Sequence, residues 1–315
     1  MALMIKECQK AAWPGHRISC RRMKQEEEQY KDLLDREAQR LGYTSSATLT
    51  KTFTDFLNAH QWTLNEASLA HIMLRSGPSM DIARSNERLE LLIFRFRCEP
   101  MHTTPHSQRN PADAFTLIEH GFFNALQYTS SGILRLKPCL DLIKESTIFH
   151  TQQLERNKPR YVGCMPILYA LDGMVGQTSR LFPVYLPVNT FVMNDFTIAA
   201  LQEFVALLAN TMNYRLPLRV VDERHPFHPV PGHIVRSGGK WVWEPLFAAW
   251  EDYEAGRAMC GRLTMLEGPR TGWPLASLMD VFCQFWGIKV HNNVEEASGA
   301  GVIQTSSSAA QRDEV

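Results

Sequence analysis

The residues with the clearest chemistry stand near the start of the sequence, where Cys8, His16 and Cys20 are spaced as potential metal ligands. Thiolate and imidazole groups are the side chains that most often bind zinc in proteins. On a helix, His16 and Cys20 are four residues apart and share one face, so both can reach a single tetrahedral ion. The residue types and their spacing therefore indicate candidate metal ligands in residues 1–20.

Together with Gln9 and Trp13, these three residues resemble the C-terminal half of the MYND-type zinc finger. The half-motif of that family reads C-x3-C-Q-x3-W-x2-H-x3-C, and "WPGHRISC" is similar to its W-P-x-H-K-x-x-C variant. Two of the five matching positions are not ligands, which makes the match more specific than a Cys/His spacing alone. The resemblance implies Zn2+ as the cofactor and Trp13 as the apolar plug between two short helices.

The match to the family is incomplete. MYND fingers bind two zinc ions, and the paired cysteines of the N-terminal half are absent here, while Met4 stands where another cysteine is expected. By family role, Cys8 belongs to the first ion and His16 and Cys20 to the second, so both sites lack part of the four ligands that a structural zinc needs. We therefore expect the finger to be unable to hold zinc as written. Two explanations stay open: a shortened product or gene model, or a natural degenerate finger.

A second cluster of metal-binding residue types occurs late in the chain. Three histidines and two carboxylates fall within 12 residues, and they could bind a transition metal. This cluster supports an alternative function, a metal-dependent enzyme. However, the segment is broken by prolines and lacks the H-E-x-x-H order, so nothing in the spacing brings the side chains together, and a loop is the favoured interpretation. The residues concerned are Asp222, Glu223, His225, His228 and His233.

Other motifs of catalysis are missing from the sequence. It contains no G-x-S-x-G elbow, Walker loop or dinucleotide fingerprint, and no motif of SET-domain methyltransferases. Enzyme activity is therefore unsupported. Trp241 and Trp243 are two residues apart and share one face of an expected strand. We expect them to face the core; if that face is exposed, it would make a partner-binding patch.

The composition narrows the class of protein. The 315 residues are 44% apolar and 21% charged, with a formal net charge of zero, which disfavours a nucleic-acid partner because phosphate binding calls for basic imbalance. The start of the chain has no apolar signal segment, and no window approaches the length of a membrane span. We expect an intracellular protein, cytoplasmic or nuclear, without a membrane partner.

The number of cysteines agrees with that location. Seven cysteines form no tight framework, which is typical of a reducing compartment. Five of them are isolated in apolar surroundings, and we expect these to be core residues: Cys98, Cys139, Cys164, Cys260 and Cys283.

Hydrophobic periodicity predicts the elements that carry these residues. After the partial finger, residues 21–80 read as helices, with one ending near Leu41, the next near His60 and a third at Gly77. Residues 81–288 read as an α+β body in which antiparallel strands pack with helices. After it, residues 289–315 are rich in Ser, Ala and Gly and should be a disordered tail.

Four features define the expected α+β body. "LELLIFRFRCEP" predicts a strand with Ile93 and Phe94 on opposite faces, and the two apolar runs within residues 160–188 predict a hairpin or a meander. "DFTIAALQEFVALLANTMNY" predicts a helix capped by Asn194 or Asp195, and the Gly-Gly pair at 238–239 predicts a hairpin turn. Shorter helices are expected in "EPLFAAWEDYEAG" and "WPLASLMDVFCQFWG".

The resemblance also suggests a function. The body beyond residue 21 is similar, through "RNPADAF" and "LFPVYLP", to the α+β bodies that accompany MYND fingers in fungal proteins of unknown function. MYND fingers mainly bind short, often proline-containing peptides of partner proteins. The implied function is a protein-interaction factor, with a protein or peptide as the partner.

Overall fold

The computed structural model describes most of the chain between residues 31 and 279. The chain divides into two units, one made of residues 1–50 and 306–315 and the other of residues 51–305. The described residues are 31–80, 88–99, 109–130, 136–155, 158–174, 177–187, 192–221, 228–261, 263, 272, 275, 278 and 279.

The first half of the expected helical region is confirmed where it is described. Residues 31–40 are helical, and Gly42 adopts a positive φ of 85° just after that helix, as a C-terminal stop requires. Helix α2 spans Ser46–Ala59 and carries the chain into the second unit. Before it, Asp35 accepts hydrogen bonds from the backbone N–H and the hydroxyl of Ser46, at 2.6 and 2.5 Å. These bonds lower the pKa of Asp35.

Helix α3 ends where the sequence predicted. It spans Gln61–Ser76, and Gly77 follows it with φ of 64° and donates its N–H to the Met73 carbonyl. The 3-10 turn η1, Gly77–Ser79, then contains the proline that prevents further helix. None of the described helices is long and apolar enough to cross a bilayer.

A four-stranded sheet forms the centre of the second unit. Its strand order is β2-β1-β3-β4, with β1 at Glu90–Cys98, β2 at Phe115–Asn124, β3 at Tyr161–Leu171 and β4 at Gln177–Tyr185. The outer pairs are antiparallel and the central pair, β1 with β3, is parallel. The parallel pair is made possible by the crossover through α5, Ala125–Ser130, and α6, Leu136–Glu155.

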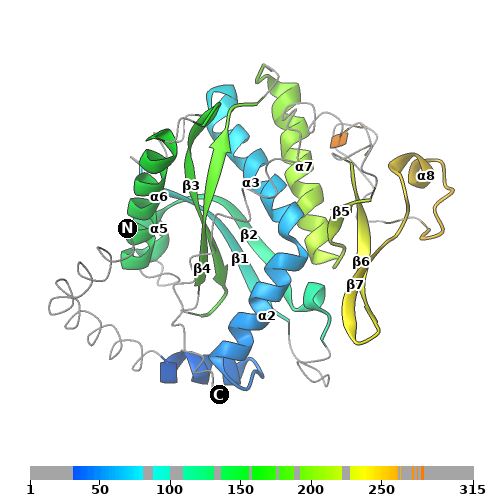
Figure 1. Ribbon diagram of the computed structural model, residues 1–315, viewed down its shortest axis with the longest axis horizontal. Helices are drawn as coiled ribbons and strands as arrows, with labels where there is room; N and C mark the ends of the chain where they lie inside the picture. Colours follow the sequence, from blue (N-terminus) through cyan, green and yellow to red (C-terminus); the bar gives the residue numbers. More distant parts are fainter. Residues whose placement is uncertain are drawn as a thin grey trace, which may run out of the picture. The chain divides into compact units, whose positions relative to one another are not determined.

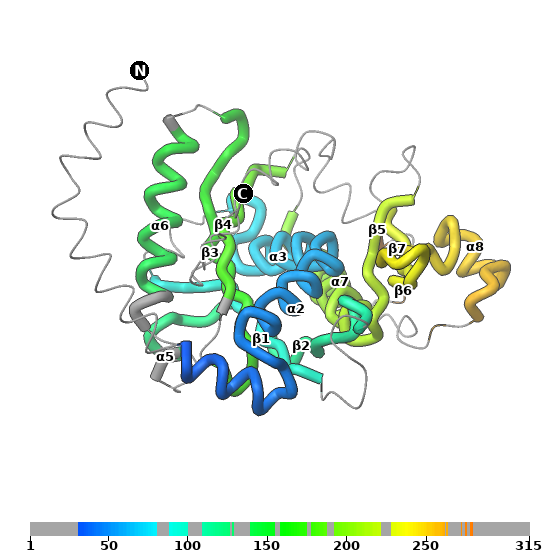
Figure 2. The backbone as a smooth tube through the Cα atoms, turned by 60° about the horizontal axis from the view of Figure 1, so that its bottom comes forward, coloured from blue at the N-terminus to red at the C-terminus, as the bar shows by residue number. Residues whose placement is uncertain are grey.

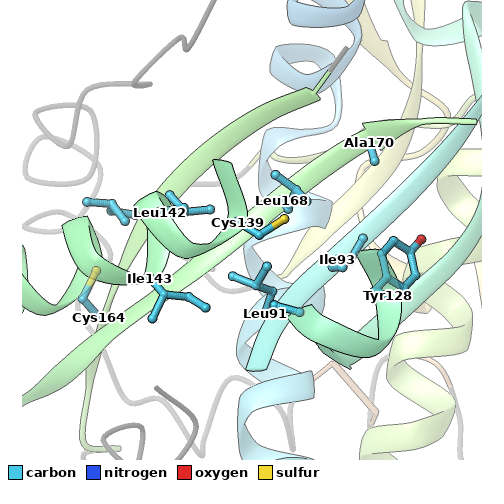
Figure 3. Packing of buried hydrophobic residues seen from close by; sticks show 11 residues of the cluster. Leu91, Ile93, Tyr128, Cys139, Leu142, Ile143, Cys164, Leu168 and Ala170 are labelled. Carbon is cyan, nitrogen blue, oxygen red and sulfur yellow. The ribbon is translucent and has the colours of Figure 1, made fainter. Parts of the chain in front are cut away.

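Helices cover both faces of this sheet. Figure 2 shows α6 on one side of β3 and β4 and α3 with α7, Asp195–Asn213, on the other. On the α6 side, Cys139, Leu142 and Ile143 pack into a cluster with Leu91 and Leu168 of the strands. Figure 3 shows Cys139 of the helix beside Leu168 and Ile143 of the helix beside Leu91. Burial raises the pKa of the Cys139 thiol to about 11, so it remains a neutral core group.

The opposite face of the sheet is aromatic. Phe96 is fully buried and makes edge contacts with Phe53 and Phe56 of α2, with ring centroids 5.7 and 5.4 Å apart. Phe94 of the same strand stacks with Tyr169 of β3 at 5.8 Å. The predicted alternation along β1 is therefore confirmed, because Ile93 packs on the α6 side and Phe94 on the α2 and α3 side.

A second sheet of three antiparallel strands stands apart from the first, beside α7 (Figure 1). Its strands are β5 at Leu218–Val220, β6 at Pro229–Ser237 and β7 at Lys240–Pro245. Ser237 pairs with Lys240 across Gly238 and Gly239, which have φ of 56° and 80°. That is the turn the Gly-Gly pair predicted, because two consecutive residues of positive φ favour glycine.

The α+β class is confirmed, but the pairing of two strands and the start of one helix differ from what the sequence predicted. The parallel pairing of β1 and β3 was not anticipated, because periodicity carries no information on strand direction. The helix expected from residue 244 begins only at Trp250 and is short, since β7 extends to Pro245; it is α8, Trp250–Glu254. The predicted cap Asn194 is confirmed, with its side chain accepting from the Thr197 N–H at 2.9 Å. The expected tail, residues 289–315, lies outside the described residues.

The cysteine prediction holds for part of the set. Cys139 and Cys164 are fully buried and free, and burial raises the pKa of both thiols. Cys98 and Cys260 form no disulfide in the described part of the chain and are only partly buried, so the core expectation is wrong for them. Cys98 is the last residue of β1, beyond the part of that strand that pairs with β3, and Cys260 lies in the turn region after α8, where less chain covers them. Cys283 lies outside the described residues.

Candidate functional site

The structure does not bear on the predicted zinc ligands. Cys8, His16 and Cys20 all lie outside the described residues. Within the part of the chain that is described, no three His, Cys, Asp or Glu side chains gather as a metal site would require. The fit of zinc to residues 1–20 therefore stays a prediction from the sequence.

The histidine-rich segment is only partly described. Asp222, Glu223 and His225 lie outside the described residues, whereas His228 precedes β6 and His233 is exposed within it. His233 is near enough to Asp113 to lower the pKa of that carboxyl, but burial outweighs it and raises the pKa of Asp113 overall. The two described histidines do not join a metal-binding group with other described residues.

The tryptophan pair lies in a different setting from the one expected. Trp241 is 37% exposed and Trp243 is half-buried, so the core-facing prediction is wrong for Trp241. Both side chains line a cavity of about 430 Å3 between the second sheet and the end of α2. Its volume falls in the range of ligand-binding pockets. We refer to this cavity, with the residues that line it, as the Trp pocket.

The position of Trp243 is fixed by the strands beneath it. Its indole N–H donates to the Pro217 carbonyl at 2.9 Å, across the width of the sheet. Gly232 of β6 lies under the indole, where an added Cβ would be only 2.4 Å from two atoms of the Trp243 ring. The missing side chain at Gly232 therefore lets the indole lie flat on the sheet. Trp243 is a pre-positioned aromatic surface rather than a freely rotating side chain.

The base of the pocket is a small apolar cluster. Ile234 of β6 packs with Ala59 at the end of α2 and with Ala112, and Trp243 covers them. His60 lies next to this cluster, fully buried, with Nε2 at 3.4 Å from the Ala112 carbonyl oxygen. Burial is the main cause that lowers the pKa of His60 to about 4, so the ring is neutral at physiological pH.

One wall is the 3-10 turn η3, Pro111–Asp113, which two side chains hold in place. Asn110 caps the turn by accepting from the Ala112 N–H at 2.9 Å, and its amide donates to the Ile234 carbonyl at 2.8 Å. Arg109 donates to the carbonyls of Glu99, Asp113 and Ala114. Since its guanidinium binds backbone oxygens, Arg109 acts mainly as a support of the wall.

The charges around the pocket are not balanced. Lys51 and Asp55 on α2 form an ion pair with Nζ and Oδ2 2.7 Å apart, so they largely offset each other. Arg219 of β5 places its guanidinium over the Trp243 ring, with Cζ 5.8 Å from the centroid. It makes no ion pair with a described residue, and partial desolvation lowers its pKa. The pocket therefore presents a cation next to an aromatic face.

A second group of polar side chains lies between α3 and the first sheet. His71 Nε2 and His120 Nδ1 are 2.9 Å apart, and the His120 ring stacks on Phe94. Burial lowers the pKa of both histidines, that of His71 to about 3. One ring must accept the hydrogen bond from the other, so the pair cannot be doubly protonated without losing it. On the same helix, burial raises the pKa of Glu66 to about 8.

Sequence reasoning identified the tryptophans of the Trp pocket but missed their partners. Arg219, Gly232 and Asn110 lie on three separate segments, and no local motif joins them. The alternation of residues along β6 and β7 was the available signal, since Ile234 and Trp243 are paired and so are Arg236 and Trp241. Comparison of the chain with protein-family models, curated proteins and solved structures finds no match.

Proposed function

We propose that this protein is an interaction factor that binds a short segment of a partner protein, and that the Trp pocket is one of its binding surfaces. The proposal joins two independent lines of support. The first is the resemblance of Cys8, Gln9, Trp13, His16 and Cys20 to half of a MYND finger, a class that binds peptides. The second is the Trp pocket of the second unit.

The observation that carries the proposal is the exposure of Trp241 beside the pre-positioned Trp243. Tryptophan and arginine are the residues most enriched at the energetic centres of protein interfaces. Here Trp241 is 37% exposed, and the indole of Trp243 is fixed by its bond to the Pro217 carbonyl. A rigid aromatic surface loses little conformational entropy when a ligand covers it.

The position of β7 adds a second feature that suits a peptide. Among the described strands, β7 pairs only with β6, so one of its edges is open. An extended peptide can pair with such an edge while its side chains enter a neighbouring pocket. Asn58 of α2 is exposed on the opposite wall and offers an amide to the same peptide.

The test begins with the purified chain and a phage-displayed library of random 12-residue peptides. Selected peptides are synthesised with blocked ends, and their affinity is measured by titration calorimetry. Trp241→Ala should weaken binding about tenfold or more, the loss typical of an interface anchor. The matched control is Val242→Ala, since Val242 is 42% exposed on the opposite face of the same strand.

The two variants decide between outcomes. A loss confined to Trp241→Ala supports the proposal. Equal affinities for wild type and Trp241→Ala, or a library that gives no peptide dependent on Trp241, would contradict it.

The zinc part of the proposal has its own test. Elemental analysis of the purified chain, of Cys20→Ser and of His228→Ala shows whether metal is bound and where. Metal that survives Cys20→Ser and vanishes with His228→Ala would favour the alternative, a metal-dependent enzyme using the segment from Asp222 to His233. A metal-free wild-type chain is the result expected for the incomplete finger.

A further inference from the structure

The residues at the Trp pocket also indicate which class of ligand it binds, an inference that rests on the proposed function. The indication is that cations lie over indoles on one face of the second sheet. Arg219 lies over Trp243, and Arg236 lies over Trp241 with the same separation of 5.8 Å between Cζ and ring centroid. Residues of neighbouring strands that are in register point to the same face, and Arg236 is in register with Trp241.

Arg219, which lines the pocket, and Arg236, which lies over its Trp241, differ from the other two cations of the lining, Lys51 and Arg109. Lys51 is paired with Asp55, and Arg109 is bonded to three backbone carbonyls. Arg219 and Arg236 form no ion pair or hydrogen bond through their side chains with any residue in the described part of the chain. A guanidinium has five N–H donors, so stacking on a ring leaves all of them available.

The stacking also fixes where the donors point. A guanidinium held over an indole loses side-chain freedom before any ligand arrives, and less is lost when a hydrogen bond forms. Its planar fork matches the two oxygens of a carboxylate. Because Trp243 is itself fixed by Gly232 and Pro217, the fork of Arg219 has a defined place beside the apolar base formed by Ile234 and Ala59.

We infer that the Trp pocket recognises an acidic segment of a partner protein, in which a carboxylate side chain binds the Arg219 guanidinium and a neighbouring apolar side chain lies against Trp241 and Trp243. Arg236, which lies over the Trp241 ring, interacts with a further acidic residue of the same segment. Asp55 takes no part in either contact, because its carboxylate already forms an ion pair with Lys51.

Nucleic acid is the other polyanion that stacks on aromatic and arginine side chains. The charge of the chain argues against it. Thirty-three basic and thirty-three acidic residues give a net charge of zero, and phosphate binding draws on a surplus of positive charge. Two arginines and a compact pocket suit a few carboxylates better than a strand of phosphates.

The test uses the blocked peptides selected on the purified full chain. Acidic positions should be enriched among them, and changing the essential Glu or Asp of a peptide to Gln or Asn should weaken binding about tenfold or more. Arg219→Gln should cause a similar loss and remove the difference between the acidic and the amide peptide. The matched control is Arg257→Gln, which removes an exposed arginine that is paired with Asp252 in the turn after α8.

A charge exchange makes the result specific for the pair. Arg219→Glu should bind the acidic peptide more weakly than Arg219→Gln does, and it should recover affinity for the peptide in which the essential acid is replaced by Lys or Arg. Circular dichroism melts of each variant confirm that the fold is kept. Recovery of binding excludes misfolding as the cause of the loss.

Three results would overturn the inference. The first is a set of Trp241-dependent peptides without acidic residues, and the second is an Arg219→Gln variant that binds them as wild type does. In both cases the proposed function stands and only the ligand class falls. The third is a fluorescently labelled oligo-dT strand that binds tightly and competes with the peptides, which would identify the pocket as a nucleic-acid site.

Discussion

Arg180 and Arg219 each lie over an aromatic ring but have different surroundings. Arg180 of β4 is 8% exposed, with its guanidinium 5.6 Å from the Phe182 centroid. It donates to the Asn65 side-chain oxygen at 2.7 Å and to the Tyr169 hydroxyl. Arg219 of β5 lies 5.8 Å from the Trp243 centroid and has no polar partner among the described residues. A guanidinium over an aromatic ring thus occurs in a closed core at Arg180 and in an open pocket at Arg219.

The difference shows how the two sheets are used. Between α3 and the four-stranded sheet, the buried rings of His71 and His120 are hydrogen-bonded to each other. A buried polar group without a partner would cost about 1–3 kcal/mol, so such regions favour polar groups that are satisfied internally. In the three-stranded sheet, exposed polar groups can form their hydrogen bonds with solvent instead. Its aromatic and cationic groups are therefore available to a ligand.

The strongest test of this contrast is Phe94→Ala, in the closed region between α3 and the four-stranded sheet. Phe94 is fully buried and stacked between His120 and Tyr169, so its loss leaves a cavity. The free energy of unfolding should fall by about 3–5 kcal/mol. Urea denaturation followed by circular dichroism measures it. A loss below about 1 kcal/mol would mean that neighbouring side chains move into the cavity, and that the core around Phe94 is loosely packed.

Gly232→Ala tests whether the open pocket depends on the flat position of Trp243. The new Cβ would come within 2.4 Å of the indole and of the Glu244 carbonyl oxygen. We expect the unfolding free energy to fall by about 1–3 kcal/mol, the usual cost of such crowding, and peptide binding to be lost. Denaturation and calorimetry measure the two effects. Unchanged indole fluorescence together with unchanged binding would contradict the role given to Gly232.

The free energy of unfolding should depend on pH in the acid range, because His71 is buried between α3 and the four-stranded sheet. The pKa of His71 falls from its usual 6.5 to about 3 in the folded protein, mainly through burial. The unfolded chain therefore binds more protons in this window, and stability is lost as the pH falls from about 6.5 toward 3, by up to about 1.4 kcal/mol per pH unit. His71→Gln should flatten the stability profile measured by urea denaturation between pH 7.5 and 5.

Two variants serve as controls for that profile. His233→Gln makes the same change at an exposed histidine of the second sheet, outside the region of His71. Glu66→Gln tests the opposite sign, because the pKa of Glu66 is raised to about 8 and its contribution to stability is lost as the pH rises from about 4.5 through 8. A His71→Gln profile parallel to wild type would show that His71 is solvated in the folded state.

The smallest effect on stability is expected for Trp241→Ala. Because Trp241 is 37% exposed, its removal should change the free energy of unfolding by no more than about 0.5 kcal/mol. The same variant is expected to lose peptide affinity, so stability and binding separate at this residue. A large loss of stability would instead place Trp241 in the structural core of the second sheet.

Local signals predicted much of the fold. Gly77 and Asn194 mark helix ends because a positive φ and a side-chain cap are properties of single residues. Gly238 and Gly239 predicted the β6–β7 turn for the same reason. The parallel pairing of β1 with β3 could not be predicted, since the partners are about 75 residues apart, as in Phe94 with Tyr169, and no local pattern encodes their direction.

For the site, the sequence alone determined that the chain mixes helices and strands, that Trp241 and Trp243 share a strand face, and that Cys8, His16 and Cys20 have metal-ligand spacing. Those properties depend on side-chain type and short-range periodicity. Only the tertiary structure decided that the tryptophan face is open rather than buried, and that Arg219 and Gly232 flank it. The physical reason is that exposure and charge pairing depend on which distant segments pack together, and short-range sequence patterns do not specify that packing.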